Sequence, residues 1–520
     1  MTPATGFTSY TDALLAVLAR DPSRAVLTTG DGGDALTAGA LHDTVHRMAA
    51  VLAGRGIGRG RTVALLSGNR PEVLAARYAA NHLGARIVFL YDGMAAATLA
   101  RIAESAETSL LLVDPALHGT ARQLLGHLRG PAPDVMTLGG EPAAGGLGPD
   151  LLAACAALPT TPEVPGTARP EGDWCIRHTG GTTGIPKGVR MAHAPYAGMI
   201  LHHRMEAAGD PPRFLACTPL AHLAGVLADA TLAAGGTVVL HRTFDPTAVL
   251  AAVARDRITH LWLLPPLLYR LLDDPTLPAT DLSSLTRLTY GGCAASPSRL
   301  ARAAEVFGPV LFGVYGMSEA MTITEARPED HLRAGPGGRI TVGRPLPGVT
   351  LTVRDADGRE MPTGERGEIH VRSAGVMSGY WKQPELTAQA LPGDGWLRTG
   401  DVGMLDDDGR LYLVDRVKDL IIVVGGHVHP AEVEDLLHTH PAVAHCAVYG
   451  VRGPDETEEV HAAVVPAPGH RVDPAVLRAF VTEHQGALYA PAVVHLVDAI
   501  PLTPVGKPDK TQLRALAAAV

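Results

Sequence analysis

The chain has 520 residues, about three times the length of one compact domain, so at least two domains are expected. Apolar residues make up 46%, and the 58 glycines and 41 prolines follow no repeat, which excludes a disordered or collagen-like protein. The formal net charge of −9 disfavours a general nucleic-acid binder, because phosphate contacts need clustered Lys and Arg. A single bound nucleotide needs only local positive charge and backbone donors.

Cysteine usage and hydropathy predict the compartment. The five cysteines include no CxxC pair, which predicts free thiols in a reducing compartment and neither a disulfide framework nor a zinc site. Residues 1–20 lack a basic segment followed by an apolar core, and no apolar run approaches the ~20 residues of a spanning helix. We therefore expect a soluble cytoplasmic protein with no membrane span and no nucleic-acid partner.

Residues 1–120 alternate between helical and strand periodicity. A helix is expected after Thr37, a good capping residue, and Gly54 is expected to end it. Pro71 suits the first turn of a second helix, which is expected to end around Gly84. The apolar runs expected to form buried strands are 62–67, 86–91 and 109–114. Strands of this kind between helices predict parallel sheets covered on both faces.

The pattern changes twice in the second half of the chain. From Val349 onwards apolar residues alternate, and the Asp-Gly pairs at 357–358 and 408–409 predict hairpin turns in an antiparallel, β-barrel-like subdomain. After Asp415, short helices and strands are mixed over roughly a hundred residues, which suits a separate small α+β domain. The predicted fold class is α/β, with an N-terminal domain over residues 1–415 and a C-terminal domain over residues 416–520.

The most informative segment is 178–189, HTGGTTGIPKGV. Its glycines allow backbone N–H groups to turn around an anion, its threonines add hydroxyl donors, and Lys187 adds positive charge. It is not a Walker A loop, because Lys187 is followed by Gly188 and that motif needs GKS or GKT. A flexible glycine-rich turn is the alternative for a loop of this composition.

Further segments follow this loop in order. They are 218–225 (TPLAHLAG), 290–297 (YGGCAASP), 315–319 (YGMSE), 395–401 (GWLRTGD), 415–419 (DRVKD) and 501–507 (PLTPVGK). Together with the loop they resemble the adenylate-forming superfamily of AMP-forming acyl- and aryl-CoA ligases, firefly luciferases and nonribosomal adenylation domains. The resemblance covers nearly the whole chain and implies a large N-terminal domain with a small mobile C-terminal domain. Gly180 departs from it, since many relatives carry a second hydroxyl residue there.

The resemblance implies how ATP and magnesium would be bound. Tyr315 would stack on adenine and Asp401 would bind both ribose hydroxyls. Glu319 would hold Mg²⁺ through oxygen coordination. The ATP-binding residues implied are Thr179, Gly180, Gly181, Thr182, Thr183, Gly184, Lys187, Gly291, Gly292, Cys293, Tyr315, Gly316, Ser318, Asp401, Arg416 and Lys507.

The resemblance also implies a catalytic lysine and a hinge. Lys507 matches the family's catalytic lysine, and Lys418 matches the position about which the small domain turns. For the basic residues Arg416 and Lys418, a structural salt bridge is the alternative. The segment implied to line the tunnel for the CoA thiol consists of Gly425, Gly426 and His427. His427 and His429 would point to one face of a strand, but no further ligands accompany them and no metal is expected there.

The expected substrate is a carboxylic acid. His222 takes the position of the family residue beside the acyl pocket, and it cannot supply the fixed negative charge that an amino acid's ammonium needs. The implied pocket residues are mostly apolar, which favours an aryl or fatty acid: His222, Leu223, Val314, Met317, Met321 and Thr322.

The predicted activity has two steps, with Lys507, Glu319 and His222 as the catalytic residues. ATP activates the acid to an acyl-adenylate with release of pyrophosphate, and the acyl group then passes to the thiol of CoA. One alternative is transfer to a carrier protein, an amine or another small nucleophile. Another is a non-catalytic nucleotide-binding relative, against which the presence of Glu319, Asp401 and Lys507 counts.

Overall fold

The computed structural model describes residues 6–30, 35–90, 94–140, 146–179, 187–202, 211–333, 335–336, 339–416, 421–423, 426–452, 458–503 and 506–518. The chain divides into two compact units. Unit 1 comprises Met1–Trp262, Asp274–Arg287 and Ala374–Ala388, and unit 2 comprises Leu263–Asp273, Leu288–Ser373 and Gln389–Val520. The division between residues 415 and 416 that the sequence suggests stays a prediction.

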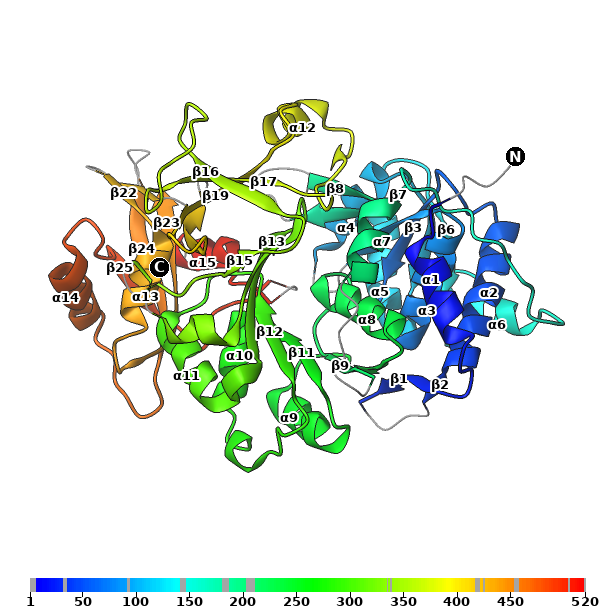
Figure 1. Ribbon diagram of the computed structural model, residues 1–520, viewed down its shortest axis with the longest axis horizontal. Helices are drawn as coiled ribbons and strands as arrows, with labels where there is room; N and C mark the ends of the chain where they lie inside the picture. Colours follow the sequence, from blue (N-terminus) through cyan, green and yellow to red (C-terminus); the bar gives the residue numbers. More distant parts are fainter. Residues whose placement is uncertain are drawn as a thin grey trace. The chain divides into compact units, whose positions relative to one another are not determined.

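The larger sheet of unit 1 contains the first predicted strands, and Figure 1 shows helices around them. Its strand order is β18-β8-β7-β4-β3-β5-β6. Strands β3 to β7 pair in parallel, whereas β7–β8 and β8–β18 are antiparallel. The strands are β3 (Thr62–Leu66), β4 (Arg86–Leu90), β5 (Thr108–Val113), β6 (Asp134–Thr137), β7 (Asp173–Thr179), β8 (Lys187–Ala192) and β18 (Gly379–Tyr380). The predicted parallel sheet is confirmed.

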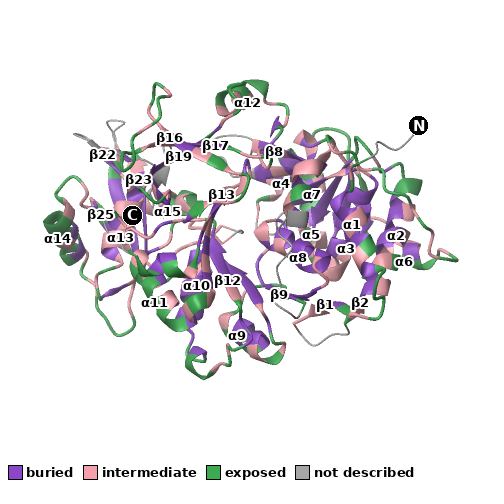
Figure 2. Cartoon of the chain, in the orientation of Figure 1, coloured by how far each residue is buried: buried purple, intermediate pink, exposed green. Residues whose placement is uncertain are grey.

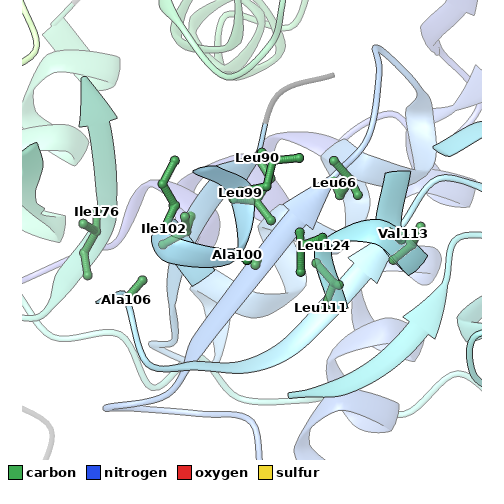
Figure 3. Close-up of a cluster of buried hydrophobic side chains, with 13 residues drawn as sticks. Leu66, Leu90, Leu99, Ala100, Ile102, Ala106, Leu111, Val113, Leu124 and Ile176 are labelled. Atoms are coloured by element: carbon green, nitrogen blue, oxygen red, sulfur yellow. The ribbon is translucent and has the colours of Figure 1, made fainter. Parts of the chain in front are cut away.

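Two helices, α4 (Ala96–Ser105) and α5 (His118–His127), pack on one face of this sheet. Leu99 and Ile102 of α4 and Leu124 of α5 are fully buried against apolar side chains of β3, β4 and β5, and Figure 3 shows this cluster. Burying each leucine or isoleucine contributes about 1.5–3 kcal/mol. This packing holds strands β3, β4 and β5 together with the two helices.

Local sequence signals explain the helices next to this sheet. The Thr37 hydroxyl accepts a hydrogen bond from the Ala40 N–H at 3.2 Å and begins α2 (Ala38–Gly54), which ends at the expected glycine. Pro71 is the first residue of α3 (Pro71–His82), where its missing N–H leaves no bond unmade. The other helices of unit 1 are α1 (Tyr10–Leu18), α6 (Leu151–Ala156), α7 (His193–His202), α8 (Leu223–Ala233) and α9 (Pro246–Arg255).

A second set of strands in unit 1 has the order β11-β9-β10-β1-β2. All of its pairs are parallel except β1–β2. The strands are β1 (Ala25–Thr29), β2 (Leu36–Thr37), β9 (Arg213–Ala216), β10 (Thr237–Leu240) and β11 (His260–Leu263). Buried strands of unit 1 alternate with helices whose outer faces are exposed, as Figure 2 shows.

Unit 2 begins with a mixed set of strands in the order β15-β14-β13-β12. Strands β12 (Arg287–Gly291) and β13 (Leu311–Met317) are parallel, and β14 (Met321–Ala326) and β15 (Arg344–Pro345) continue the set antiparallel. Two helices of this part are α10 (Pro265–Leu272) and α11 (Pro297–Phe307). Ser296 is the N-cap residue of α11, and Pro297 is its first residue.

The predicted antiparallel subdomain is a four-stranded sheet in the order β16-β17-β19-β20. Its strands are β16 (Thr350–Arg354), β17 (Gly367–Arg372), β19 (Leu397–Leu405) and β20 (Leu411–Arg416). Strands β19 and β20 form the hairpin predicted from Asp408 and Gly409, and the φ of +73° at Gly409 is one that glycine adopts without strain. Helix α12 (Pro384–Ala390) lies between β18 and β19 in the sequence.

The C-terminal part of unit 2 is the α+β arrangement expected from the sequence. Strands β23-β24-β25 form a sheet, and α13 and α14 bury Val433 and Leu477 against it. On α15, Leu513 is buried beside Tyr449 of β23. These elements are β21 (Ile421–Val423), β22 (Gly426–Val428), α13 (Pro430–Leu437), β23 (Val443–Arg452), β24 (Glu458–Pro466), α14 (Pro474–Gln485), β25 (Val493–Leu496) and α15 (Lys510–Ala518).

A histidine links the first helix of unit 1 to α3. His82 Nδ1 lies 3.2 Å from Asp12 Oδ1, and His82 Nε2 lies 2.7 Å from the Val164 carbonyl oxygen. Burial alone would lower the pKa of His82, but its bonds to Asp12 and Val164 outweigh burial and raise that pKa above its ordinary value. Burial would raise the pKa of Asp12, and the bond to His82 reverses this and lowers it.

This pair makes stability depend on pH. A raised folded-state pKa means that the charged imidazole stabilises fully below its unfolded pKa of about 6.5, and that this contribution fades as pH rises through the folded-state pKa. We expect Asp12→Asn to lower the free energy of unfolding more at about pH 5.5 than at about pH 8.5. Urea unfolding at the two pH values measures this, and equal losses would contradict it.

Candidate active site

A tight turn in unit 2 carries Ser318 and Glu319. It joins β13 to β14, with Met317 and Met321 opposite each other in the ladder. Gly316 is required there, because a Cβ on it would overlap the Met321 carbonyl oxygen. Met321 itself has φ +59°, which is uncommon for a residue with a side chain and marks a sharp reversal. The Glu319 side chain is held by this turn and is 8% exposed.

The structure joins the predicted adenine and ribose residues directly. Tyr315 Oη donates a hydrogen bond to Asp401 Oδ2 at 2.7 Å, and both side chains are buried. The Asp401 N–H in turn donates to the Thr399 hydroxyl at 3.1 Å. Asp401 also stands opposite Arg416 in the β19–β20 ladder, although the Arg416 side chain lies outside the described atoms. A nucleoside would thus meet an aromatic ring and a carboxylate that are already fixed to each other.

The glycines of the predicted adenine segment allow close backbone packing. Gly291 ends β12 opposite Val314 of β13, and a Cβ on Gly291 would overlap the Val314 carbonyl oxygen. Gly292 has φ +87°, which only glycine adopts readily. Burial raises the pKa of the Cys293 thiol to about 12, opposed by the positive charge of Lys507 and reinforced by Glu434. Lys507 therefore acts electrostatically on this segment.

Lys507 itself ends a short turn. The Lys507 N–H donates to the Thr503 hydroxyl at 3.1 Å, and the Thr503 N–H donates to the Lys507 carbonyl at 2.7 Å. Gly506 has φ +82° and lies against Leu264, the N-cap residue of α10, and Leu267 of that helix. The turn thus fixes the position of the Lys507 backbone.

Unit 1 carries the ends of the predicted phosphate loop. Thr179 ends β7 and Lys187 begins β8, and the two residues are opposite each other in the ladder. Lys187 Nζ lies 5.2 Å from the centre of the Tyr380 ring, a cation–π distance. The residues between them, including Gly180, Gly181, Thr182, Thr183 and Gly184, lie outside the described residues.

His222 of unit 1 is the N-cap residue of α8, and Leu223 is the first residue of that helix. The segment before it is held by Asn69, which the sequence reasoning missed. The Asn69 amide donates to the Thr218 carbonyl at 2.9 Å and accepts from the Leu220 N–H at 3.0 Å. Asn69 is buried three residues after β3. A polar residue just beyond the carboxyl end of a parallel strand is the signal that would have found it.

Helix α8 is anchored by a buried ionic cluster. Arg77 pairs with Asp229, and the Tyr78 and Tyr196 hydroxyls donate to the Asp229 oxygens at 2.6 and 2.5 Å. A buried carboxylate is stable only with several donors of this kind. This cluster restrains the helix whose N-terminus carries His222.

The remaining acid-pocket candidates share one hairpin of unit 2. Val314 and Met317 lie on β13, and Met321 and Thr322 on β14, and all four are only partly buried. Lys418 and Gly425 lie outside the described residues, as does the His427 side chain. The expectation that His427 and His429 share a strand is wrong, because β22 ends at Val428 and His429 is the N-cap of α13.

The described ranges hold neither a clustered metal-ligand set nor a helix suited to spanning a membrane. Within those ranges no group of three or more His, Cys, Asp or Glu residues is arranged to hold a metal ion. None of the helices in the described part of the chain is both long and apolar enough to cross a membrane.

Comparison with known proteins identifies the class. The family model of AMP-binding enzymes matches residues 15–381, and the AMP-binding enzyme C-terminal domain matches residues 432–507. The chain is 38% identical to the medium/long-chain-fatty-acid–CoA ligase FadD8 of Mycobacterium tuberculosis, over 96% of this chain and 89% of that protein.

Two solved structures share the whole architecture. The amide bond synthetase McbA from Marinactinospora thermotolerans has a TM-score of 0.85 and 40% identity, over 98% of this chain and 100% of that one. ATP-bound MatB from Rhodopseudomonas palustris has a TM-score of 0.85 and 28% identity, over 98% and 99%. Fold and site together define an adenylate-forming, AMP-forming ligase. The chain belongs to the AMP-binding enzyme family, which confirms the resemblance and the α/β fold class.

The Tyr315 hydroxyl offers a test of the nucleotide site. Tyr315→Phe removes the donor to Asp401 but keeps the ring, so we expect KM for ATP to rise about fivefold, the equivalent of roughly 1 kcal/mol. Tyr412→Phe is the matched control, because the Tyr412 hydroxyl also donates to an aspartate, Asp406, at 3.1 Å. Steady-state kinetics at varied ATP measures both, and equal changes in the two variants would contradict the assignment.

Proposed function

We propose that the protein uses ATP to convert a fatty or aryl carboxylic acid to its acyl-adenylate and then forms the CoA thioester. The observation that carries this proposal is the bonded pair of Tyr315 and Asp401 in the same unit as Lys507, whose charge acts on Cys293. Binding an adenylate needs an aromatic ring for the base, an acceptor for the ribose hydroxyls and a cation for the phosphate. Tyr315, Asp401 and Lys507 would supply these groups.

The first step has an electrostatic obstacle, because a carboxylate and a triphosphate repel each other. Lys507 would bridge the substrate carboxylate and the α-phosphate oxygens, which stabilises charge and fixes the line of attack. The carboxylate oxygen would then bond to the α-phosphorus as the bond to pyrophosphate breaks. Thr182, Thr183 and Lys187 would bind the leaving phosphates, and Asp401 would hold the ribose.

The residues present fit magnesium. Mg²⁺ is commonly held by one or two carboxylates together with substrate phosphates and water, so the single buried carboxylate of Glu319 is sufficient as the protein's share. Bound there with ATP, the ion would supply positive charge that screens the phosphates. Ser318, on the same turn, would add a hydroxyl donor.

The acid is proposed to be apolar. Met317, Met321 and Val314 are partly buried side chains on the β13–β14 hairpin, and methionine adapts its shape to varied ligands. His222 and Leu223 would complete the pocket. FadD8, a fatty acid–CoA ligase by name, supports the same class.

The acceptor is proposed to be the CoA thiol, with an amine as the second candidate. The relative FadD8 supports CoA, whereas the amide bond synthetase McbA, at 40% identity over the full length of that chain, favours an amine. For the thiol, the C-terminal domain would turn at Lys418 so that Gly425, Gly426 and His427 line the tunnel. A carrier-protein thiol would enter by the same route.

Lys507→Ala tests the activation step. We expect acid-dependent exchange of pyrophosphate into ATP to fall about 10²- to 10³-fold, because one preorganised charge contact is lost in the transition state. Lys510→Ala, a nearby lysine on α15, is the matched control and should keep exchange unchanged. If Lys507→Ala exchanges pyrophosphate as fast as Lys510→Ala and the unmodified enzyme, the proposed role of Lys507 is contradicted.

A panel of carboxylic acids tests the acid and the acceptor together. Pyrophosphate release is measured for fatty, aryl and amino acids, and products are then identified with CoA, with small amines and with a carrier protein. We expect release with apolar acids and a CoA thioester as the product. Formation of an amide without any thioester would mean that the acceptor is the amine and not CoA. Absence of pyrophosphate release with every acid would contradict the activation step itself.

A further inference from the structure

An aromatic contact joins the C-terminal domain to the body of unit 2. The imidazole of His445 on β23 stacks on the ring of Tyr269 on α10, with ring centres 6.1 Å apart and planes 12° apart. His445 Nε2 also lies 3.9 Å from Asp273 Oδ2, just beyond the end of α10. Figure 1 shows α10 and α11 beside this domain. None of these residues matched a family motif in the sequence.

Tyr269 is held rigidly on its own side of the contact. The Arg299 guanidinium lies over the Tyr269 ring at 5.0 Å and donates to the Tyr269 carbonyl at 3.0 Å and to Asp273 Oδ2 at 2.6 Å. The Tyr269 hydroxyl accepts a hydrogen bond from the Ser296 N–H at 2.6 Å. Ser296 caps α11 and follows Cys293 by three residues. The ring therefore connects His445 to the predicted adenine segment.

The stack involves a neutral imidazole. Burial, and then the charge of Arg299, lowers the pKa of His445, and Asp273 only partly opposes them. On the same domain, burial lowers the pKa of His438 to about 4, so it adds no charge at neutral pH. Asp273 is already paired with Arg299. The contact is thus one of ring against ring, and a phenylalanine can reproduce it.

A second contact lies at α13. Glu432 is 3.1 Å from Arg339 and 3.4 Å from Arg366, residues that precede the proposed hinge. This ionic contact would remain when the stack is lost. Loss of the stack should therefore shift the domain's position without detaching it.

The stack and the lysine meet the same segment. Tyr269, which stacks on His445, bonds to Ser296, and the charge of Lys507 acts on Cys293, so the C-terminal domain reaches segment 293–296 through two residues, His445 and Lys507. A domain that turned away would break the stack and withdraw Lys507 together. The stack is then present only in the arrangement that serves acid activation.

We propose that Tyr269 and His445 are positioning residues that hold the C-terminal domain in the arrangement for acid activation. The proposal rests on the proposed role of Lys507 in that step. Aromatic pairs of this kind contribute enough to shift such an equilibrium about two- to tenfold. The two half-reactions should therefore respond differently when the stack is removed.

The test measures each half-reaction separately in the full-length enzyme. Activation is followed by pyrophosphate exchange, and transfer by adding CoA to chemically prepared acyl-adenylate. We expect His445→Ala to slow activation about three- to tenfold and to leave transfer unchanged or faster. His445→Phe should restore activation, and His470→Ala, an exposed histidine of the same domain, should change neither half-reaction.

A double variant separates this inference from the proposed function. In a Lys507→Ala background, His445→Ala should slow activation no further, because the stack acts through the lysine. Equal slowing of both half-reactions by His445→Ala, or no slowing of activation, would overturn the stack's role while a loss of exchange in Lys507→Ala still supports the function. If Lys507→Ala retains full exchange, the proposed role of the lysine fails first.

Discussion

A carboxylate removed from water has to be held by hydrogen-bond donors, and the site in unit 2 depends on how Asp401 meets this requirement. Its partner is the hydroxyl of Tyr315, on a different strand 86 residues away. This donor is a neutral hydroxyl, so the contact is a hydrogen bond and not an ion pair. The bond to Tyr315 fixes the orientation of the Asp401 carboxylate. A ligand that bound to its remaining lone pairs would therefore meet a side chain that is already ordered, which lowers the entropic cost of binding.

Much of the fold could be predicted because its signals are local. Thr37 begins a helix as a capping residue, and the pair Asp408 and Gly409 forms a hairpin. Pro71 opens α3, as its lack of an N–H permits. Each of these features is determined by a residue and its immediate neighbours, so no knowledge of tertiary contacts is needed.

The contacts that organise the site could not be predicted in the same way. Asn69 binds the segment at Thr218 and Leu220, about 150 positions later. Its place just after a predicted strand could have marked it as a candidate, but the sequence does not identify these partners. Tyr269 and His445 are equally ordinary residues until the fold brings them together. The family motifs identified groups that would touch ATP, whereas residues that hold those groups in place become visible only through packing.

The Cys293 thiol, on which the charge of Lys507 acts, is a suitable group near this lysine. Burial raises the pKa of Cys293 to about 12, so the thiol is uncharged at neutral pH and would not compete with a substrate for the Lys507 ammonium. The carboxylate of Glu434, which also acts on Cys293, accepts the Val448 N–H at 2.7 Å through Oε1. A carboxylate in place of Cys293 would pair with the lysine and reduce its attraction for a phosphate. A neutral group at this position would therefore suit the role proposed for Lys507.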